Sequence, residues 1–278
     1  MKATDYRSAL QPVWCPGCGD FGVLKGLTQA FADLELAPEK LGVISGIGCS
    51  SRLPGYMRAF SFNSIHGRAL PIASGLKLAR PDLTVVVVGG DGDGFSIGIG
   101  HVPPAVRRDV DLMYAVMDNG IYGLTKGQAS ATTEVEVKRD LGLAGVDEQP
   151  INPVMFVLSL GCGFVARTHA GNLPHMREMF REGVRHPGFA FVHVLAGCAT
   201  YQTKAYQEEI RARTDMLPAD HDPTDFRRAV DVALDERFKL GVIYRRPAVA
   251  TPQVWSAGVA ARAAAEPREE PTPPADAD

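Results

Sequence analysis

The sequence predicts an α/β protein built around a doubly wound parallel sheet. Two apolar runs, residues 83–88 and 112–117, are continuous rather than alternating, which is typical of strands buried on both faces. Strand-like runs alternate with helix-like segments along the chain, and this alternation favours a parallel sheet covered by helices. Each of the two runs ends in an acid or amide beside glycine, first in Gly90-Asp91-Gly92 and then in Asp118-Asn119-Gly120.

The first half of the chain supplies the elements around these runs. A helix is expected after residue 20, where apolar residues recur at helical spacing, at Phe21, Leu24, Leu27, Phe31 and Leu34. A short strand is expected at 41–45, and a helix that begins near His66 is ended by Pro81. The first apolar run leads into a glycine-rich loop at 89–100 and a short helix at 101–108.

The second half continues the alternation and then loosens after residue 200. A long polar loop beside the active site is expected after Ser130, as far as Asp147. Later elements are expected at 152–160 (helix), 163–167 (strand), 173–184 (helix), 189–195 (strand), 224–238 (helix, capped by Thr224 or Asp225) and 241–244 (edge strand). We therefore expect a main domain at 1–204 and a C-terminal extension at 205–262 that packs on this domain or on a partner. The polar, proline-rich end, residues 263–278, is expected to be disordered.

Composition and charge exclude several classes of protein. A chain of 278 residues with 45% hydrophobic and 22% charged residues is ordinary for a soluble globular protein. The formal net charge of -3 gives no reason to expect nucleic-acid binding. The chain has neither an apolar run of the roughly 18–20 residues that span a membrane nor an apolar secretory signal at its start. We expect a cytoplasmic protein, in which disulfides are rare.

Asp91 and Asn119 follow two strands of the expected sheet. The carboxyl ends of neighbouring parallel strands share one crevice, so these two side chains could meet on one ion. Their hard oxygen atoms suit Mg²⁺ that carries a phosphate group. The adjacent glycines would let backbone N–H groups approach that phosphate closely. The alternative is a pair of tight turns in which glycine supplies the positive φ angles.

Four of the five cysteines lie in glycine-bearing loops. Cys15 and Cys18 form a C-x-x-C turn, whereas Cys49 and Cys198 each lie in a loop that follows an expected strand. Four thiolates that converge on one centre can hold zinc or an iron–sulfur cluster, and their spacing does not separate the two. The fifth, Cys162, has apolar neighbours and is expected in the core, where free cysteine is common.

The motifs resemble those of a known enzyme family. Gly-Asp-Gly followed after 26 residues by Asn is similar to the thiamine-diphosphate-binding motif, although Asp118 stands where many members have a second Asn. CPGCGD, GIGCSSR, HGRALP, GDGD, DNGIYGLTKGQAS and the late Cys198 occur in the order seen in the β subunit of 2-oxoacid:ferredoxin oxidoreductases. The resemblance covers residues 10–205 and continues weakly through HDPTD and GVIYRRP. Gly197 stands where relatives often have Pro before the last cysteine.

The resemblance implies a thiamine-diphosphate-binding fold that holds the diphosphate end of the cofactor within residues 1–204. Mg²⁺ would be held by Asp91, Asn119 and the carbonyl of Ile121. The cofactor would contact the loop Ile47, Gly48, Cys49 and Ser50 near its ring end, and its diphosphate would contact Gly90, Gly92, Gly123, Leu124 and Thr125. One [4Fe–4S] cluster would be held by Cys15, Cys18, Cys49 and Cys198. His66 would hydrogen-bond the cofactor or move protons near it; the alternative is a capping or core histidine.

The family's activity would be the oxidative decarboxylation of a 2-oxoacid, with coenzyme A as co-substrate and ferredoxin as electron acceptor. The TKGQAS segment favours 2-oxoglutarate over pyruvate or another 2-oxoacid, and the reaction could also run in reverse. The chain lacks the pyrimidine-binding module with its activating glutamate, which implies an α subunit and an (αβ)2 assembly. Lys126, Arg52 and Arg68 are candidates to attract acidic ferredoxin or a distal substrate carboxylate, the alternative being solvated surface charges.

Two other functions stay open from the sequence. A non-oxidative thiamine-dependent decarboxylase or synthase would leave four loop cysteines without a role. A non-catalytic, zinc-binding assembly subunit would leave the pairing of Asp91 with Asn119 unexplained.

Overall fold

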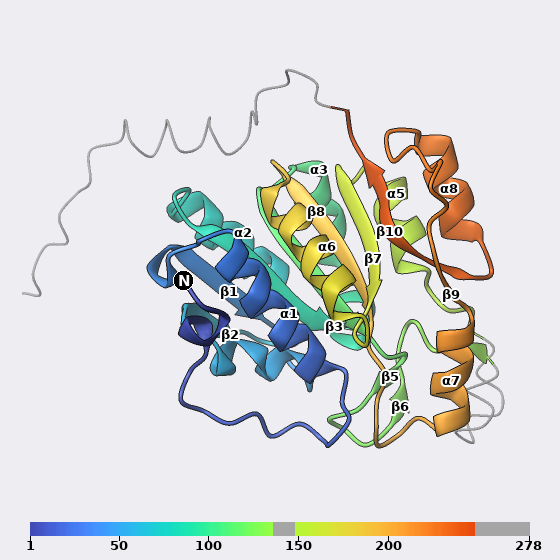
Figure 1. Ribbon diagram of the computed structural model, residues 1–278, viewed down its shortest axis with the longest axis horizontal. Helices are drawn as coiled ribbons and strands as arrows, with labels where there is room; N and C mark the ends of the chain where they lie inside the picture. Colours follow the sequence, from blue (N-terminus) through green and yellow to red (C-terminus); the bar gives the residue numbers. More distant parts are fainter. Residues whose placement is uncertain (136–147, 248–278) are drawn as a thin grey trace, which may run out of the picture.

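A computed structural model describes residues 1–135 and 148–247, and its centre is an eight-stranded sheet (Figure 1). The strand order is β2-β1-β3-β4-β8-β7-β10-β9. Paired strands run parallel except for β10, which is antiparallel to β7. The strands are β1 (Leu41–Ser45), β2 (Phe60–Asn63), β3 (Thr84–Gly90), β4 (Leu112–Asp118), β7 (Phe164–His169), β8 (Phe189–Leu195), β9 (Thr214–Met216) and β10 (Phe238–Arg245). The predicted doubly wound α/β sheet is confirmed, except that β10 and its parallel neighbour β9 run opposite to the other six strands.

Helices cover both faces of this sheet (Figure 1). One face carries α1 (Asp20–Asp33) and α6 (Leu173–Arg185). The other carries α2 (Ala69–Ala79), α3 (Val102–Arg107), α5 (Pro153–Ser159) and α8 (Phe226–Leu234). The remaining elements are α7 (Lys204–Ala212), the β5 (Ile121–Tyr122) and β6 (Gln128–Ala129) hairpin, the 3₁₀ turns η1 (Ala3–Tyr6), η2 (Pro38–Lys40), η3 (Ser50–Tyr56) and η5 (Ile99–His101), and the π-helix η4 (Gly92–Ile97).

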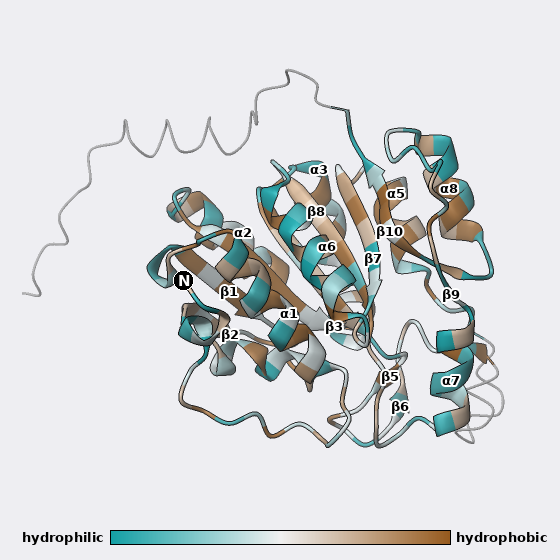
Figure 2. Cartoon of the chain, viewed as in Figure 1, coloured by the Kyte–Doolittle hydropathy of each residue, from teal (hydrophilic) through white to brown (hydrophobic). Residues whose placement is uncertain are grey.

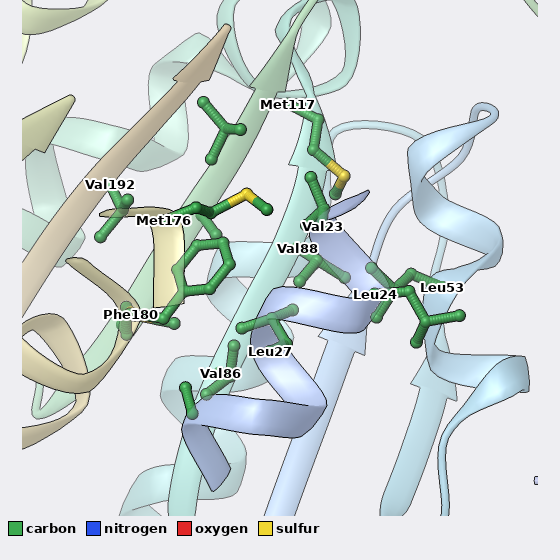
Figure 3. Packing of buried hydrophobic residues seen from close by; sticks show 14 of the residues in the cluster. Val23, Leu24, Leu27, Leu53, Val86, Val88, Met117, Met176, Phe180 and Val192 are labelled. Atoms are coloured by element: carbon green, nitrogen blue, oxygen red, sulfur yellow. The ribbon is translucent and has the colours of Figure 1, made fainter. Parts of the chain in front are cut away.

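The continuous apolar strands divide the interior into two cores. Successive strand residues face opposite sides, so Val86 and Val88 face α1 and α6, whereas Val85 and Val87 face the other helices. Figure 3 shows the first core, in which α1 and α6 meet the sheet through Val23, Leu24, Leu27, Met176 and Phe180. Burying each of these large side chains stabilises the fold by about 1.5–3 kcal/mol. These two cores fix the strand ends that carry the candidate site.

Helix α6 is amphipathic, with apolar residues towards the sheet and hydrophilic residues towards solvent. Figure 2 shows hydrophobic strands inside the sheet and hydrophilic residues along the visible sides of α6 and α7. Among the described residues, no helix is both long enough and apolar enough to pass through a membrane.

Several predicted elements are confirmed with small changes at their ends. The strands expected at 41–45 and 189–195 are β1 and β8, and the helix expected after residue 20 is α1. Asp225 caps α8, because its carboxylate accepts hydrogen bonds from the backbone N–H groups of Arg227 and Arg228. The expected strand at 241–244 lies within β10, but β9 pairs beyond it, so the prediction of an edge strand was wrong.

Other elements were not predicted from the sequence. The edge strand β2 alternates Phe60 and Phe62 with polar residues, but this run has only four residues and both phenylalanines are exposed. The glycine-rich loop expected at 89–100 contains η4 and the start of η5, and β6 lies just before the polar loop expected after residue 130. Residues 136–147 of that loop and the tail expected at 263–278 lie outside the described residues. The domain boundary at 204 stays a prediction, and the segment after it adds β9 and β10 to the main sheet.

Candidate active site

A cavity of about 480 Å³ lies at the carboxyl ends of β1, β3 and β4. The loops that follow these three strands line it, because parallel neighbours end at the same edge of the sheet. Every residue predicted to contact the cofactor or Mg²⁺ lies on this cavity: Ile47, Gly48, Cys49, Ser50, His66, Gly90, Asp91, Gly92, Asn119, Ile121, Gly123, Leu124 and Thr125. The structure therefore brings these residues together, while their individual roles stay predictions.

Asp91 lies at the base of the cavity and is 2% exposed. One oxygen of its carboxylate accepts the backbone N–H of Asn119 at 3.3 Å, and the other accepts the Thr132 hydroxyl at 3.1 Å. Burial, followed by the charge of Asp118, raises the pKa of Asp91 to about 7. A buried carboxylate beside a second acid is a suitable place for a cation. The Asp91 and Asn119 side chains and the Ile121 carbonyl offer the hard oxygen donors that Mg²⁺ prefers.

Gly92 shapes one wall of the cavity, because its backbone lies directly against the Tyr122 ring. A Cβ at Gly92 would overlap with the Tyr122 ring, whose hydroxyl donates a hydrogen bond to the Gly92 carbonyl at 3.2 Å. Tyr122 in turn lies 6.1 Å from the His66 ring, centroid to centroid. Gly92 thus lets β5 approach the loop that carries Asp91. The same lack of side chains would let backbone N–H groups reach a diphosphate.

Three cysteine-bearing loops converge beside this cavity. The sulfur atoms of Cys49 and Cys198 both face Gly123, at 3.5 and 3.7 Å from the point where a Cβ on that glycine would lie. The Cys15–Cys18 turn packs against the loop after β8, where Gly19 donates its N–H to the Gly197 carbonyl at 3.3 Å. Cys15 is exposed, and Cys18, Cys49 and Cys198 are half-buried.

The thiols of this region lie close enough to influence one another. Burial, then the charges of Asp20, Cys198 and Cys15, raise the pKa of Cys49. Burial and Asp20 also raise the pKa of Cys18. Thiolates held this close need a positively charged centre, and thiolate donors suit zinc or an iron–sulfur cluster. Over residues 1–135 and 148–247, no three His, Cys, Asp or Glu side chains are grouped tightly enough to bind a single metal ion.

Comparison with known proteins identifies the family. The profile of the thiamine pyrophosphate enzyme C-terminal TPP-binding domain matches residues 46–194, and that of the C-terminal part of the pyruvate ferredoxin oxidoreductase β subunit matches residues 198–253. The β subunit of 2-oxoacid:ferredoxin oxidoreductase 2 from Aeropyrum pernix is 39% identical over 254 residues, which is 86% of this chain and 82% of that protein. The chain belongs to the 2-oxoacid:ferredoxin oxidoreductase β-subunit family.

Two further similarities concern 2-oxoglutarate enzymes. The 2-oxoglutarate synthase subunit KorB of Archaeoglobus fulgidus is 37% identical over 243 residues, which is 85% of this β subunit and 86% of that protein. A solved 2-oxoglutarate:ferredoxin oxidoreductase from Magnetococcus marinus, with 2-oxoglutarate, coenzyme A and succinyl-CoA bound, superposes with a TM-score of 0.89. That similarity has 39% identity and covers 95% of this chain and 90% of the other.

The remaining predicted residues of the β subunit have distinct environments. Cys162 is fully buried and its thiol lies 3.2 Å from the Phe164 carbonyl, which confirms it as a core residue. Lys126 and Arg52 are exposed. Arg68 is half-buried and donates weak hydrogen bonds to the carbonyls of Gly67 and Ile97. None of these contacts assigns a partner to the three cations, so their roles stay predictions.

A buried polar chain behind the cavity was missed from the sequence. Arg167 Nε donates to His193 Nδ1 at 3.2 Å, and His193 Nε2 lies 2.8 Å from the Asp118 carboxylate. The Asp118 carboxylate also accepts the hydroxyl of Thr132 at 2.8 Å, and this hydroxyl touches Asp91 as well. The chain thus runs from the cavity base across β4, β8 and β7. A signal existed, since Arg167 and His193 interrupt apolar strands.

The polar chain also borders a second cavity of about 680 Å³. This cavity lies at the ends of β4, β7 and β8 and is lined by Asp118, Arg167 and His193, among others. Burial lowers the pKa of Arg167 to about 10 and also lowers that of His193. Burial is the largest single influence and raises the pKa of Asp118, but His193 and the hydrogen bonds from Thr132 and the Gly120 N–H together outweigh it and hold the pKa of this carboxyl below its usual value. Asp118 and Arg167 are therefore opposite charges joined through a neutral imidazole.

Proposed function

We propose that this β subunit holds thiamine diphosphate and Mg²⁺ in the 480 Å³ cavity and one [4Fe–4S] cluster at Cys15, Cys18, Cys49 and Cys198. In complex with an α subunit, it oxidises 2-oxoglutarate with coenzyme A to succinyl-CoA and CO₂. The cluster held by these four cysteines would supply the route for electrons to ferredoxin. The observation that carries the proposal is Gly123, which lies on the cavity and faces the sulfur atoms of both Cys49 and Cys198.

Each group of residues would have a separate task in this enzyme. Asp91, Asn119 and the Ile121 carbonyl hold the metal, and the backbone around Gly90, Gly92 and Gly123 binds the diphosphate. Bound thiamine diphosphate supplies the nucleophilic carbon that allows CO₂ to leave a 2-oxoacid, chemistry that side chains do not provide. His66 lines the same cavity and can exchange a hydrogen bond or a proton with the bound molecule.

Similarity to 2-oxoglutarate enzymes supports the choice of substrate. The Archaeoglobus fulgidus relative is named a 2-oxoglutarate synthase subunit, and the Magnetococcus marinus structure contains 2-oxoglutarate, coenzyme A and succinyl-CoA. The partner is an α subunit that carries the pyrimidine-binding module, and the assembly is (αβ)2 in the cytoplasm. Pyruvate or another 2-oxoacid is the alternative substrate.

The test uses the αβ complex, produced and purified without oxygen. We expect a brown protein with absorbance near 400 nm that dithionite bleaches, four irons for each β subunit, and ferredoxin reduction that is faster with 2-oxoglutarate than with pyruvate. Cys198→Ser should remove the absorbance, whereas Cys162→Ser should keep it, because Cys162 is buried away from the cavity. A colourless protein that contains zinc and no iron would overturn the proposal.

A further inference from the structure

Asp93 is the second acid of the Gly-Asp-Gly-Asp segment and has no assigned role. It lies in η4, lines the 480 Å³ cavity and is 3% exposed. A π-helix is rare and is frequently found at functional sites. A buried carboxylate needs hydrogen-bond donors, so its partners indicate what it does in the cavity.

The partners of Asp93 come from two other loops of the cavity. Its Oδ1 accepts the backbone N–H of Ile47 at 3.0 Å and that of Gly67 at 2.7 Å. The same oxygen lies 2.9 Å from Nδ1 of His66. One carboxylate thus joins the loop after β1, the turn before α2 and η4.

The glycines on both loops are required by this arrangement. A Cβ at Gly46 would overlap with the Asp93 carboxylate, so residue 46 must lack a side chain. Gly67 has φ +71°, and a Cβ there would lie 2.6 Å from the Ile97 side chain and 2.7 Å from the Gly98 nitrogen. Both glycines therefore serve to bring the loops against η4 and its acid.

The hydrogen-bond pattern at Oδ1 determines the tautomer of His66. Backbone N–H groups can only donate, so an oxygen that receives two of them acts as an acceptor towards the third partner as well. His66 Nδ1 must then carry the proton that it shares with Asp93. In the neutral imidazole, Nε2 is then left with a lone pair and is the ring nitrogen available to a molecule in the cavity.

We propose that Asp93 is a positioning residue that holds His66 as the Nδ1–H tautomer and presents Nε2 as a hydrogen-bond acceptor to the molecule in the cavity. The identity of that molecule, thiamine diphosphate with its substrate, rests on the proposed function. The Nδ1–H tautomer of His66 does not rest on the proposed function. The tautomer and the identity of the bound molecule can therefore fail separately.

The first experiment determines the tautomer of His66 in the full chain and requires no activity measurement. Long-range ¹H–¹⁵N spectra of histidine-labelled protein distinguish protonated from unprotonated ring nitrogens, and His66→Gln identifies the His66 signals. We expect protonated Nδ1 and unprotonated Nε2 in the wild type, and the Nε2–H form in Asp93→Ala. Wild-type His66 in the Nε2–H form would overturn the proposal, even if Asp93→Ala does not fold.

The second experiment asks whether Asp93 acts through His66. Asp93→Asn keeps the size and an acceptor oxygen but removes the charge that supports a proton on His66. We expect roughly tenfold loss of thiamine diphosphate affinity or of kcat in the αβ complex, and less than about twofold loss when His66 is already Gln. Equal losses in the two backgrounds would mean that Asp93 has a structural role only and would overturn the proposal.

A matched substitution serves as the control. Asp82→Asn removes an exposed aspartate that pairs with Lys40 and Arg80, away from the cavity. It should leave both the His66 spectrum and cofactor affinity unchanged. If the complex shows no activity with any 2-oxoacid while the Nδ1–H tautomer is present, the proposed function fails and the Asp93–His66 pairing stands.

Discussion

Asp118 distinguishes this chain from the thiamine-diphosphate-binding motif that it resembles. An asparagine there would be neutral, whereas the aspartate brings a second acid close to Asp91. Its carboxylate is joined through His193 to Arg167, which is 3% exposed. Arg167 is thus the buried cation that balances the charge of Asp118, and removing either charge would leave the other buried without a partner. We infer that Asp118, His193 and Arg167 act as a unit.

Asp118→Asn should therefore destabilise the chain, although it restores the more common residue. Arg167 can only donate, which makes His193 Nδ1 an acceptor and Nε2 a donor. The asparagine would have to turn its oxygen towards His193, and Arg167 would lose its countercharge. We expect a loss of about 2–4 kcal/mol in the free energy of unfolding, measured by urea denaturation.

The control for Asp118→Asn is the double variant with Arg167→Met. Once the buried cation is absent, the same asparagine should cost clearly less than it does in the wild type. Additive losses would show that the three residues do not form a unit.

The part of the site that lies at the ends of strands could be predicted from the sequence. Gly90-Asp91-Gly92 and Asn119 follow strands with continuous apolar patterns, and the cavity gathers both. By contrast, β9 has no buried residue, so its pairing with β10 rather than a local pattern determines it. The Asp93–His66 contact joins positions 27 residues apart through two loops, and no spacing rule indicates it. Long-range loop packing is the part that the sequence pattern does not reveal.

His186, at the junction between α6 and β8, should make the stability of the chain depend on pH. His186 ends α6, its ring centroid lies 5.5 Å from that of Phe164, and its Nε2 is buried with no hydrogen-bond partner in the described part of the chain. Burial, as the main cause, lowers the pKa of His186 to about 4. Between about pH 4 and 6.5 the unfolded chain therefore binds more protons than the folded one, and stability falls as the pH falls through this window.

His186→Phe should remove this part of the pH dependence. We expect the wild type to lose on the order of 2 kcal/mol more than the variant between pH 7 and pH 4.5, as measured by urea midpoints of the isolated chain. His101→Phe, a control at a half-buried histidine on the other side of the sheet from α6, should follow the wild type. Parallel pH curves for wild type and His186→Phe would contradict the assignment.

The candidate active site opens through an apolar rim. Four large aliphatic side chains stand exposed on or beside the cavity loops, namely Ile47, Ile65, Ile97 and Leu124. Exposed apolar residues that gather around a binding site mark a surface that another protein covers. The chain also belongs to a family of β subunits. Both observations favour an α subunit that closes the cavity from this side.

Ile65→Asp should therefore weaken assembly with the α subunit. Ile65 is 73% exposed beside His66, so the change should hardly affect folding of the isolated chain, but it would bury a charge in the complex. We expect at least about tenfold weaker binding of the α subunit and a matching loss of 2-oxoacid-dependent activity at low protein concentration.

Leu234→Asp is the matched control, since Leu234 is 65% exposed at the end of α8, on the far side of the sheet from β2 (Figure 1). Equal affinity of both variants for the α subunit, measured by calorimetry, would show that the partner does not cover the cavity rim.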